Sequence, residues 1–426
     1  MYLICKFYNP TKRSDGKLTN EAPNLEKVFL PLPENDLSSS FLNPFPTLNR
    51  LRQTTPIRYD EARQCWDIFG YQEIQHILKA PECFSSVIPG KFENSLSLPE
   101  SILELDPPQH TKLRKIAGKA FAPAALSQLE AKIAAIANEL IDRVARQGEM
   151  DFVADFANPL PVIVISEMLG VEQNDRALFK HWSDTMVKSP ADASPESLER
   201  LYTEQLQARR ELEAYFRQVI ELRRTDPQED LISQIVHTEV DGEKLTFNQI
   251  VEFCILLLVA GNETTTNLLG NFVRLLTERS ELQPAVYGNP ERLKTMIEET
   301  LRFYSPVQAL LRYAKQDTDI QGCHLKKDDV LVLWLASANR DPAVFDRPDE
   351  LDIDRSPNPH VAFGFGIHFC LGAMLSRMEA QIALDIATKR LHGIRLAPCA
   401  ALAPIPNAFF FGLQTLPIEF DPEHGL

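Results

Sequence analysis

The chain has 426 residues, 44% of them hydrophobic, and a formal net charge of −15 from 44 basic and 59 acidic side chains. This length is sufficient for a large buried core, and the acidic balance argues against a protein that binds nucleic acid. The longest apolar run near the middle, 254–260, is too short to span a bilayer, and residues 1–20 lack the apolar core of a signal peptide. Seven cysteines without paired spacing predict free thiols and a cytoplasmic location.

The N-terminal quarter is predicted to begin with an unstructured lead. Residues 1–20 mix charged and polar side chains, so we expect a disordered lead over 1–29 and a single domain over 30–426. Short alternating strands followed by a helix are predicted within 59–79. Residues 84–105 contain Pro89, Gly90 and Pro99 and lack periodicity, which predicts a long loop of the kind that often carries function.

The middle of the chain is predicted to be helical. Asp106, Pro107 and Pro108 are expected to start a helix, because prolines suit a first turn. Amphipathic helices follow over 129–147, 161–169, 176–188 and 195–225, with a polar break at 189–194. A long helix over 247–279, capped near Thr246, is apolar nearly all round from 255 to 260, so we expect it to run through the interior. After Pro306 the chain changes toward strands, including 330–335, which predicts a mainly α fold with a smaller β region.

The most informative segment is the run Phe-Gly-Phe-Gly-Ile-His-Phe-Cys-Leu-Gly at 363–372. Gly364 and Gly366 allow backbone angles that are closed to other residues. Cys370 precedes an amphipathic helix predicted over 371–391, whose free N–H groups would stabilise a thiolate. A shielded thiolate suits an axial ligand of haem iron. The alternative for an isolated cysteine is a buried structural thiol, but two glycines and a histidine at fixed offsets favour the haem ligand.

This run resembles the haem-binding signature of the cytochrome P-450 superfamily. The pattern in soluble bacterial members is Phe-Gly-x-Gly-x-His-x-Cys-x-Gly, and every position matches. The resemblance implies that Cys370 is the proximal metal ligand of haem b, that His368 contacts a propionate, and that Phe363 packs near the sulfur beside Gly364. It also implies the cytochrome P-450 fold, with haem between the long interior helix and the cysteine loop.

The interior helix contains the polar segment Ala-Gly-Asn-Glu-Thr-Thr at 260–265. Polar groups in an apolar helix are costly without a task or a partner. A threonine can bond back to a carbonyl three or four residues earlier, and Gly261 lets the helix open into a groove. A satisfied core threonine with a solvent-pointing glutamate is the alternative for this segment alone. Beside Cys370, the resemblance implies that Thr264 hydrogen-bonds dioxygen and that Glu263 relays protons.

Three further cations match positions that bind haem propionates in bacterial relatives. His110 and Arg114 lie four apart on one helix face, and Arg312 follows in an extended segment. Each alone would be interpreted as a surface cation, but their order and spacing agree with the family.

A separate charged set is interpreted as structural. Glu299 and Arg302 lie three apart on a helix and match the family's Glu-x-x-Arg element, a buried ion-pair network. Arg355 is the candidate third member, although some relatives place an arginine where Glu350 stands here.

The resemblance implies a haem-thiolate monooxygenase that hydroxylates or epoxidises a lipophilic molecule, such as a fatty acid, terpenoid, steroid or macrolide precursor. The pocket is expected to be lined by the 84–105 loop, the 176–210 helices, and Leu256, Val259, Ala260, Val307, Leu310 and Phe410. Electrons are expected from a separate ferredoxin or flavodoxin with its NAD(P)H reductase. The alternatives are a peroxide-driven peroxygenase, whose relatives tend to lose the acid–threonine pair, and a non-catalytic haem sensor, which needs no such threonine.

A basic cluster stands out in this acidic chain. Lys112, Arg114, Lys115 and Lys119 share one short predicted helix. The alternative interpretation is a solvated helix face without a specific role. We predict that Arg114 points inward and that the lysines attract an acidic electron donor.

Overall fold

The computed structural model describes residues 25–32, 34, 41–89, 100–188, 195–240 and 242–422. Most of the predicted lead, 1–24, lies outside these residues, as do the break at 189–194 and part of the predicted loop, 90–99. Within the predicted lead, α2 (Leu25–Val28) is helical, and Val28 is fully buried in the core. The packed chain therefore begins before residue 30, because Val28 occupies a place in the core.

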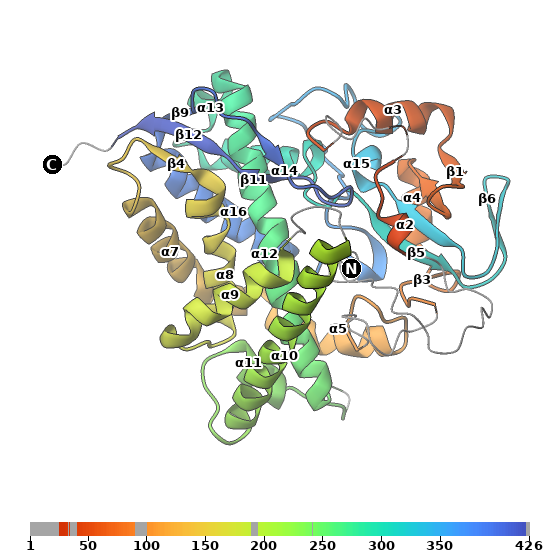
Figure 1. The fold of residues 1–426 in the computed structure, drawn as a ribbon, viewed down its shortest axis with the longest axis horizontal. Helices are drawn as coiled ribbons and strands as arrows, with labels where there is room; N and C mark the ends of the chain where they lie inside the picture. The colour runs from red at the N-terminus through yellow and green to blue at the C-terminus, as the bar shows by residue number, and fades with distance from the viewer. Residues whose placement is uncertain are drawn as a thin grey trace.

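The described chain is mainly helical, with smaller sheets at its periphery (Figure 1). The helices are α2, α3 (Phe45–Thr54), α4 (Tyr71–Lys79), α5 (Gln109–Ala120), α6 (Pro123–Leu126), α7 (Glu130–Asp142), α8 (Pro159–Met168), α9 (Arg176–Val187), α10 (Pro195–Thr225), α11 (Leu231–His237), α12 (Phe247–Glu278), α13 (Gln283–Val286), α14 (Pro290–Phe303), α15 (Leu335–Ala338) and α16 (Ala373–Arg390).

The predicted helices agree with the structure, with differences at their ends. Helix α10 has the predicted bounds, and α12 ends one residue early. Helix α5 begins after Pro107 and Pro108 rather than at Asp106, since the two prolines form the turn that precedes the helix. Helix α7 ends at Asp142, five residues before the predicted end, and α16 begins at Ala373, three residues after Cys370.

Helix α12 runs through the middle of the molecule (Figure 1). Its start is fixed by a capping box, in which Thr246 Oγ1 accepts from the Gln249 N–H at 3.2 Å and Gln249 Oε1 accepts from the Thr246 N–H at 2.9 Å. Most of its side chains are buried, and it contacts α8, α9, α10, α14 and α16. A polar segment within this helix therefore lies inside the protein, as the sequence predicted.

The largest sheet has five strands in the order β1 (Ile57–Asp60), β2 (Cys65–Ile68), β8 (Val330–Leu333), β5 (Leu310–Ala314) and β3 (Phe84–Ser85). Only β2 and β8 pair in parallel, with Trp66 opposite Leu331. Strand β3 occupies the start of the segment predicted as loop, because Phe84 pairs with Ala314. The other strands are β4 (Glu149–Asp151), β12 (Pro417–Asp421) and β9 (His392–Leu396) in one sheet, β6 (Thr318–Ile320) with β7 (Cys323–Leu325), and β10 (Ala403–Pro404) with β11 (Leu413–Thr415).

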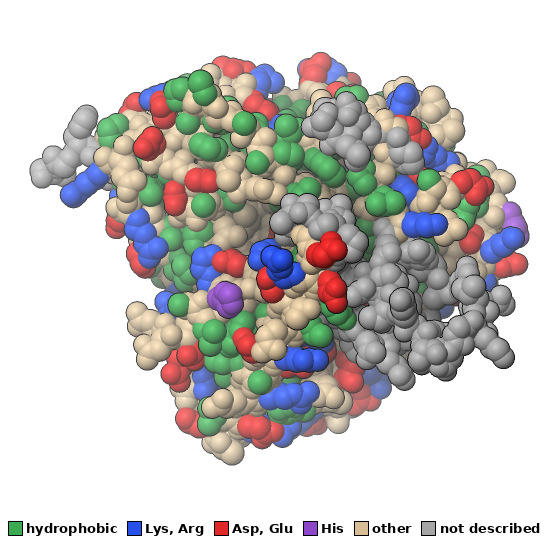
Figure 2. All heavy atoms as spheres, in the orientation of Figure 1, with side chains coloured by type: hydrophobic (Ala, Val, Ile, Leu, Met, Phe, Trp, Pro, Cys, Tyr) green, Lys and Arg blue, Asp and Glu red, His purple; other side chains and the backbone are tan. Residues whose placement is uncertain are grey.

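Two further properties bear on function, the apolar character of the helices and the distribution of surface charge. Within the described ranges, no helix has both the length and the apolar character that a membrane span requires. On the face shown in Figure 2, basic and acidic side chains are interspersed. Mixed signs at short range keep the local field weak over that face.

Candidate functional site

The cysteine loop is shaped by two glycines. Gly364 and Gly366 have φ of +72° and +70°, which side chains rarely tolerate. A Cβ at Gly366 would lie 2.2 Å from the Leu78 carbonyl oxygen, so this residue must be glycine for the loop to pack on α4. The Cys370 N–H donates to the Phe363 carbonyl at 2.9 Å, which closes the loop before α16 begins.

The Cys370 sulfur lies in a buried environment, where a bare thiolate is unfavourable and a bound cation would stabilise it. It lines a cavity of about 260 Å³. Burial raises the pKa of Cys370, while a hydrogen bond from the Gly372 N–H and the charges of Arg114 and Arg377 act to lower it. The helix-end stabilisation predicted from the sequence is thus present but outweighed by burial. A metal ion bound to the sulfur would replace the proton.

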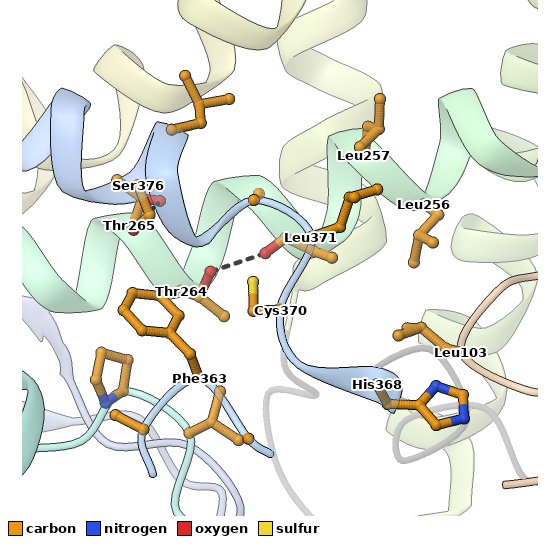
Figure 3. A pocket seen from close by; sticks show the side chains of 18 of the residues that line it. Leu103, Leu256, Leu257, Thr264, Thr265, Phe363, His368, Cys370, Leu371 and Ser376 are labelled. Atoms are coloured by element: carbon orange, nitrogen blue, oxygen red, sulfur yellow. Dashed lines mark hydrogen bonds between the residues drawn. The ribbon is translucent and has the colours of Figure 1, made fainter. Parts of the chain in front are cut away.

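The cavity lies between the cysteine loop and the middle of α12 (Figure 3). Cys370 and Phe363 line it from the loop, and Thr264 lines it from α12. Thr264 Oγ1 donates to the Ala260 carbonyl at 2.8 Å, which is the back-bonding predicted for this threonine. Since its proton is engaged with the helix, the Thr264 oxygen can accept a hydrogen bond in the cavity.

A second cavity of about 180 Å³ adjoins the first. Both are lined by Leu103, Ala260, Thr264 and His368, among others. All six residues predicted for the substrate pocket line the second cavity, and Glu263 lines it too: Leu256, Val259, Ala260, Val307, Leu310 and Phe410. The sequence pattern therefore identified a set of side chains that the fold brings together.

The expected contribution of the 176–210 helices is not found. Within the described part of this range, no residue lines either cavity, and Ile165 of α8 lines the first cavity instead. Helix α9 is joined to α12 by the hydrogen bond from Asn262 Nδ2 to Ser183 Oγ at 2.8 Å. Helix α10 is joined to it by an ion pair between Arg209 and Glu252 at 2.7 Å. These contacts join α9 and α10 to α12 through residues that line neither cavity.

A buried histidine, His110, and a partly buried one, His368, lie in ring contact at the edge of the cavities, with their planes tilted by 48°. The rings of His110 and His368 have centroids 4.1 Å apart, and His368 Nε2 lies 3.0 Å from Ser86 Oγ. Neither ring nitrogen of His110 has a hydrogen-bond partner among the described residues, although the side chain is buried. Burial lowers the pKa of His110 to about 4 and that of His368 to about 2, with further lowering by nearby arginines.

Two arginines complete this edge. Arg312 on β5 is buried, donates to the Leu311 carbonyl at 2.7 Å, and has its pKa lowered to about 10 by burial. Arg114 on α5 lines the first cavity and donates to the Phe369 carbonyl. Asp106 is the carboxylate that acts on Arg312 and His110. Buried cations and orphaned imidazole nitrogens call for further anionic acceptors.

These observations fit a haem group. A sulfur ligand, apolar walls and a cluster of nitrogen donors at one edge match its iron, its macrocycle and its two propionates. The four donors His110, Arg114, Arg312 and His368 come from α5, β5 and the cysteine loop, and they are the set predicted from the sequence.

The predicted ion-pair network is formed. Glu299 and Arg302 are fully buried, and two hydrogen bonds of 2.7 and 2.8 Å join them. Arg355 Nε lies 3.2 Å from both carboxylate oxygens of Glu299. Glu350 contributes only its carbonyl oxygen, to both arginines. Arg355 is therefore the third side chain of the network, which packs away from both cavities.

Sequence reasoning missed a buried acid on α16. Glu379 is fully buried in the first cavity's wall, its Oε2 has no hydrogen-bond partner in the described chain, and burial raises its pKa to about 8. Ser376, one turn earlier, lies 3.4 Å from Thr265 through their hydroxyl oxygens. The spacing of Leu375, Ser376 and Glu379 places them on one face of α16, the helix that follows Cys370. This spacing is the sequence signal that could have revealed them.

The basic cluster of α5 is divided by the fold. Arg114 points inward, as predicted. Lys112 Nζ pairs with Glu243 at 2.6 Å, and Lys119 Nζ donates to the Glu239 carbonyl at 3.2 Å. The exposed part of the cluster is thus partly neutralised by Glu243.

Comparison with known proteins agrees with this geometry. The family model described as cytochrome P450 matches residues 59–390. Cytochrome P450 109 of Bacillus spizizenii is 45% identical over 412 residues, which cover 96% of this chain and 98% of that protein. Substrate-free CYP109E1 from Bacillus megaterium has a TM-score of 0.87 at 42% identity, covering 89% of this chain and 99% of that chain. CYP109E1 in complex with testosterone has a TM-score of 0.82 at 41% identity, with the same coverage. The chain therefore belongs to the cytochrome P450 family and is a cytochrome P450 monooxygenase.

Proposed function

We propose that this monooxygenase binds haem b through the Cys370 sulfur and hydroxylates or epoxidises a lipophilic small molecule. The observation that carries the proposal is the shared cavity, which Cys370 lines from one side and Thr264 from the other. When bound, haem supplies the electron-rich iron that activates O2, so that one oxygen atom enters the substrate and the other becomes water.

The protein's own part in cofactor binding is electrostatic and steric. His110, Arg114, Arg312 and His368 would hold the propionates through the nitrogen atoms at the cavity edge. Phe363 would shield the sulfur, and its ring is held by Arg377, whose guanidinium carbon lies 4.4 Å from the ring centroid. Gly364, which has a positive φ, would let the loop turn at the cofactor site without a side chain.

Thr264 and Glu263 would control protons. The Thr264 hydroxyl is anchored to the Ala260 carbonyl, so its oxygen is presented to the cavity in a fixed direction. Glu263, the preceding residue, lines the adjoining cavity and would bring protons toward that oxygen. The buried pair Glu299 and Arg302, with Arg355, would act in structure rather than in the reaction.

The walls of the second cavity support a lipophilic substrate. Leu256, Val259, Val307, Leu310 and Phe410 present aliphatic and aromatic surface. The testosterone complex of CYP109E1 supports a steroid-sized molecule among the proposed classes, which also include fatty acids, terpenoids and macrolide precursors.

Electrons would come from a separate ferredoxin or flavodoxin with its NAD(P)H reductase. Lys112, Lys115 and Lys119 are exposed on α5, and this positive charge supports an acidic partner on that side of the protein even though Lys112 pairs with Glu243. We also propose a cytoplasmic location, which suits the free thiols of the described cysteines.

The test compares product formation by the holoenzyme with NAD(P)H and a ferredoxin–reductase pair against product formation with peroxide alone. We expect product with the redox chain and a carbon-monoxide complex of the reduced protein that absorbs at the thiolate-specific position. Cys370→Ala should lose that absorption, whereas Cys254→Ala, at a buried thiol outside both cavities, should keep it.

Three outcomes would contradict the proposal. Retention of the thiolate-specific band in Cys370→Ala would remove the assigned ligand. Product with peroxide only would indicate a peroxygenase, and haem binding without any product would indicate a sensor.

A further inference from the structure

One wall of the second cavity comes from the 409–412 segment, near the C-terminus. Phe410 lines this cavity, whereas Phe409 and Phe411 line neither cavity. Phe410 forms an antiparallel β-bridge with Val307, another residue of the cavity wall. Neighbouring side chains point to opposite faces of an extended chain, so the two flanking rings pack on the other side of the segment. There the Phe409 ring meets that of Phe29, with centroids 4.8 Å apart.

Helix α12 lines the second cavity and then passes under this segment. Thr264 is the last residue of α12 in the cavity wall. Asn267 and Asn271 follow it by three and seven residues, so they continue the same face of the helix, yet they line neither cavity. The backbone of Gly412 lies directly on Asn267, because a Cβ at Gly412 would be 2.1 Å from Asn267 Oδ1. The second cavity therefore ends on α12 where the 409–412 segment covers the helix.

Asn271 ties this segment to α12. Its side chain is fully buried, and its Nδ2 donates to the carbonyls of Phe411 and Tyr304, both at 3.0 Å. These two bonds use both hydrogens of the amide nitrogen. Neither amide atom of Asn267 has a hydrogen-bond partner among the described residues, so Asn267 sets the spacing of the two elements without such a bond. Asn271 thus fixes the backbone that carries Phe410 against the helix.

The position of Phe410 limits the depth of the cavity measured from Thr264. Thr264 lines both cavities, and Cys370 lines the first of them. A substrate with one end near Thr264 can extend along α12 only as far as the Phe410 ring. Each buried CH2 group is worth about fourfold in affinity, so a small displacement of Phe410 changes which chain length binds best. A residue that fixes Phe410 therefore acts on specificity without touching the substrate.

We propose that Asn271 is a positioning residue that sets the length of apolar substrate accepted by the second cavity, because it ties the segment that carries Phe410 to α12. Gly412 is required for the close approach of this segment to Asn267. The inference rests on the proposed function, since it takes the second cavity as the substrate site.

The experiment measures the depth of the cavity with 1-alkylimidazoles of increasing chain length. The imidazole nitrogen binds haem iron and fixes one end of each chain. Binding to the holoenzyme is read from the Soret shift. In the wild type, affinity should rise about fourfold per CH2 group until the chain reaches Phe410, and should then stop rising. We call the chain length at which the rise stops the length limit.

Asn271→Ala removes both hydrogen bonds to the segment and should extend the length limit. We expect the rise to continue for about two further CH2 groups, so the longest chains should gain about tenfold in affinity over the wild type. Affinity for the shortest chains should stay the same, since the walls near Thr264 are unchanged. Phe410→Ala, which removes the ring itself, should extend the limit as well.

Gly412→Ala tests the same contact from the opposite side. Its Cβ would meet Asn267 Oδ1, so the segment should move away from α12 and the length limit should increase. Adding Asn267→Ala to Gly412→Ala removes the clashing amide and should restore most of the wild-type limit. This pair decides the question if Asn271→Ala fails to retain haem.

Asn262→Ala is the matched control. Asn262 is a buried amide on the same helix, but it donates to Ser183 Oγ of α9 and lines neither cavity. This variant should keep the wild-type length limit even where it loses stability. A haem content and thiolate-specific band equal to those of the wild type establish that each variant is folded.

Three results would overturn the inference. An unchanged length limit in folded Asn271→Ala would remove its positioning role. An unchanged limit in Phe410→Ala would show that the chain ends elsewhere, and an extended limit in Asn262→Ala would assign the effect to a general loosening of α12. Each of these with the thiolate-specific band and product formation intact leaves the proposed function standing, whereas loss of the band and of all turnover in the wild type removes both.

Discussion

Buried charged and polar groups are fully hydrogen-bonded in one region of this molecule and incompletely hydrogen-bonded in another. In the network of Glu299, Arg302 and Arg355, every carboxylate oxygen and most guanidinium nitrogens have partners at 2.6–3.3 Å. Around the cavities, polar atoms of His110 and Glu379 have no hydrogen-bond partner among the described residues. Complete pairing is typical of groups that hold a fold together, while incomplete pairing indicates where a ligand completes the site.

The strongest test of this contrast is the removal of one partner from the paired region. Arg302→Met should leave Glu299 buried without its main cation. Breaking a buried pair in this way costs roughly 3–5 kcal/mol. Urea denaturation of the holoenzyme should show a loss of that size. The matched control is Arg292→Met, which breaks the exposed pair with Asp354 and should cost about 0–1 kcal/mol. Equal losses in the two variants would end the distinction between the regions.

The unpaired region can be tested through its pH dependence. The pKa of Glu379 is raised to about 8 by burial from an ordinary value of 4.5. The folded protein therefore keeps the proton on Glu379 at pH values where the unfolded chain has lost it. The stability from this protonation is complete below pH 4.5 and is lost as the pH rises through 8. Since a tenfold change in proton affinity is about 1.4 kcal/mol, the loss should reach a few kcal/mol.

Glu379→Gln should flatten this part of the stability profile, measured by thermal unfolding of the holoenzyme across that pH range. Asp385→Asn on the same helix is the control, because Asp385 pairs with Lys389 and is partly exposed. The control should keep the wild-type slope. An unchanged slope in Glu379→Gln would show that another group controls it.

Thr264 sharpens the contrast because it is hydrogen-bonded and yet lines the cavity. Thr264→Ala should keep haem content and the substrate-induced Soret shift, since no apolar wall is lost. Product formed per NAD(P)H should fall by about tenfold, because positioned proton donors and acceptors contribute at least that much. The remaining electrons should appear as peroxide or water. Thr264→Ser, which retains the hydroxyl, should recover most of the coupling, and unchanged coupling in Thr264→Ala would contradict the proposed role.

The smallest expected effect lies outside both regions, on the surface of α5. Charge reversal at Lys112 and Lys115 should slow the first electron transfer from an acidic ferredoxin several-fold and remove most of its salt dependence. Substrate affinity should not change. The same reversal at Lys326 and Lys327, an exposed pair in the turn before β8, is the control. A wild-type rate and salt dependence in the Lys112 and Lys115 variant would exclude this face as the docking site.

The sequence predicted best what chain-local spacing determines. The cysteine loop, the interior helix and the pairing of Glu299 with Arg302 all depend on residues close in the chain, and Arg355 followed from the resemblance. The buried acids escaped prediction because Glu379 and Glu252 stand on helices, where a glutamate usually faces water. Whether it does so depends on packing against distant elements.

The same reason explains why no residue in the described part of 176–210 lines either cavity, although the sequence led us to expect a contribution from this range. The amphipathic pattern of α9 and α10 predicts an apolar face but not the distance of that face from the cavities. That distance is set by side-chain contacts with α12 such as Asn262 with Ser183, which join residues far apart in the chain.

The parallel pairing of β2 with β8 also constrains how the protein is made. The two strands are separated by about 260 residues, so at a synthesis rate of about 5–20 residues per second β2 waits roughly 10 to 50 s for its partner. During that time its edge is open to other chains. Cys370 leaves the ribosome later still. Cofactor capture is thus among the last events of biogenesis. A shortage of haem would leave a fully synthesised chain whose first cavity is empty.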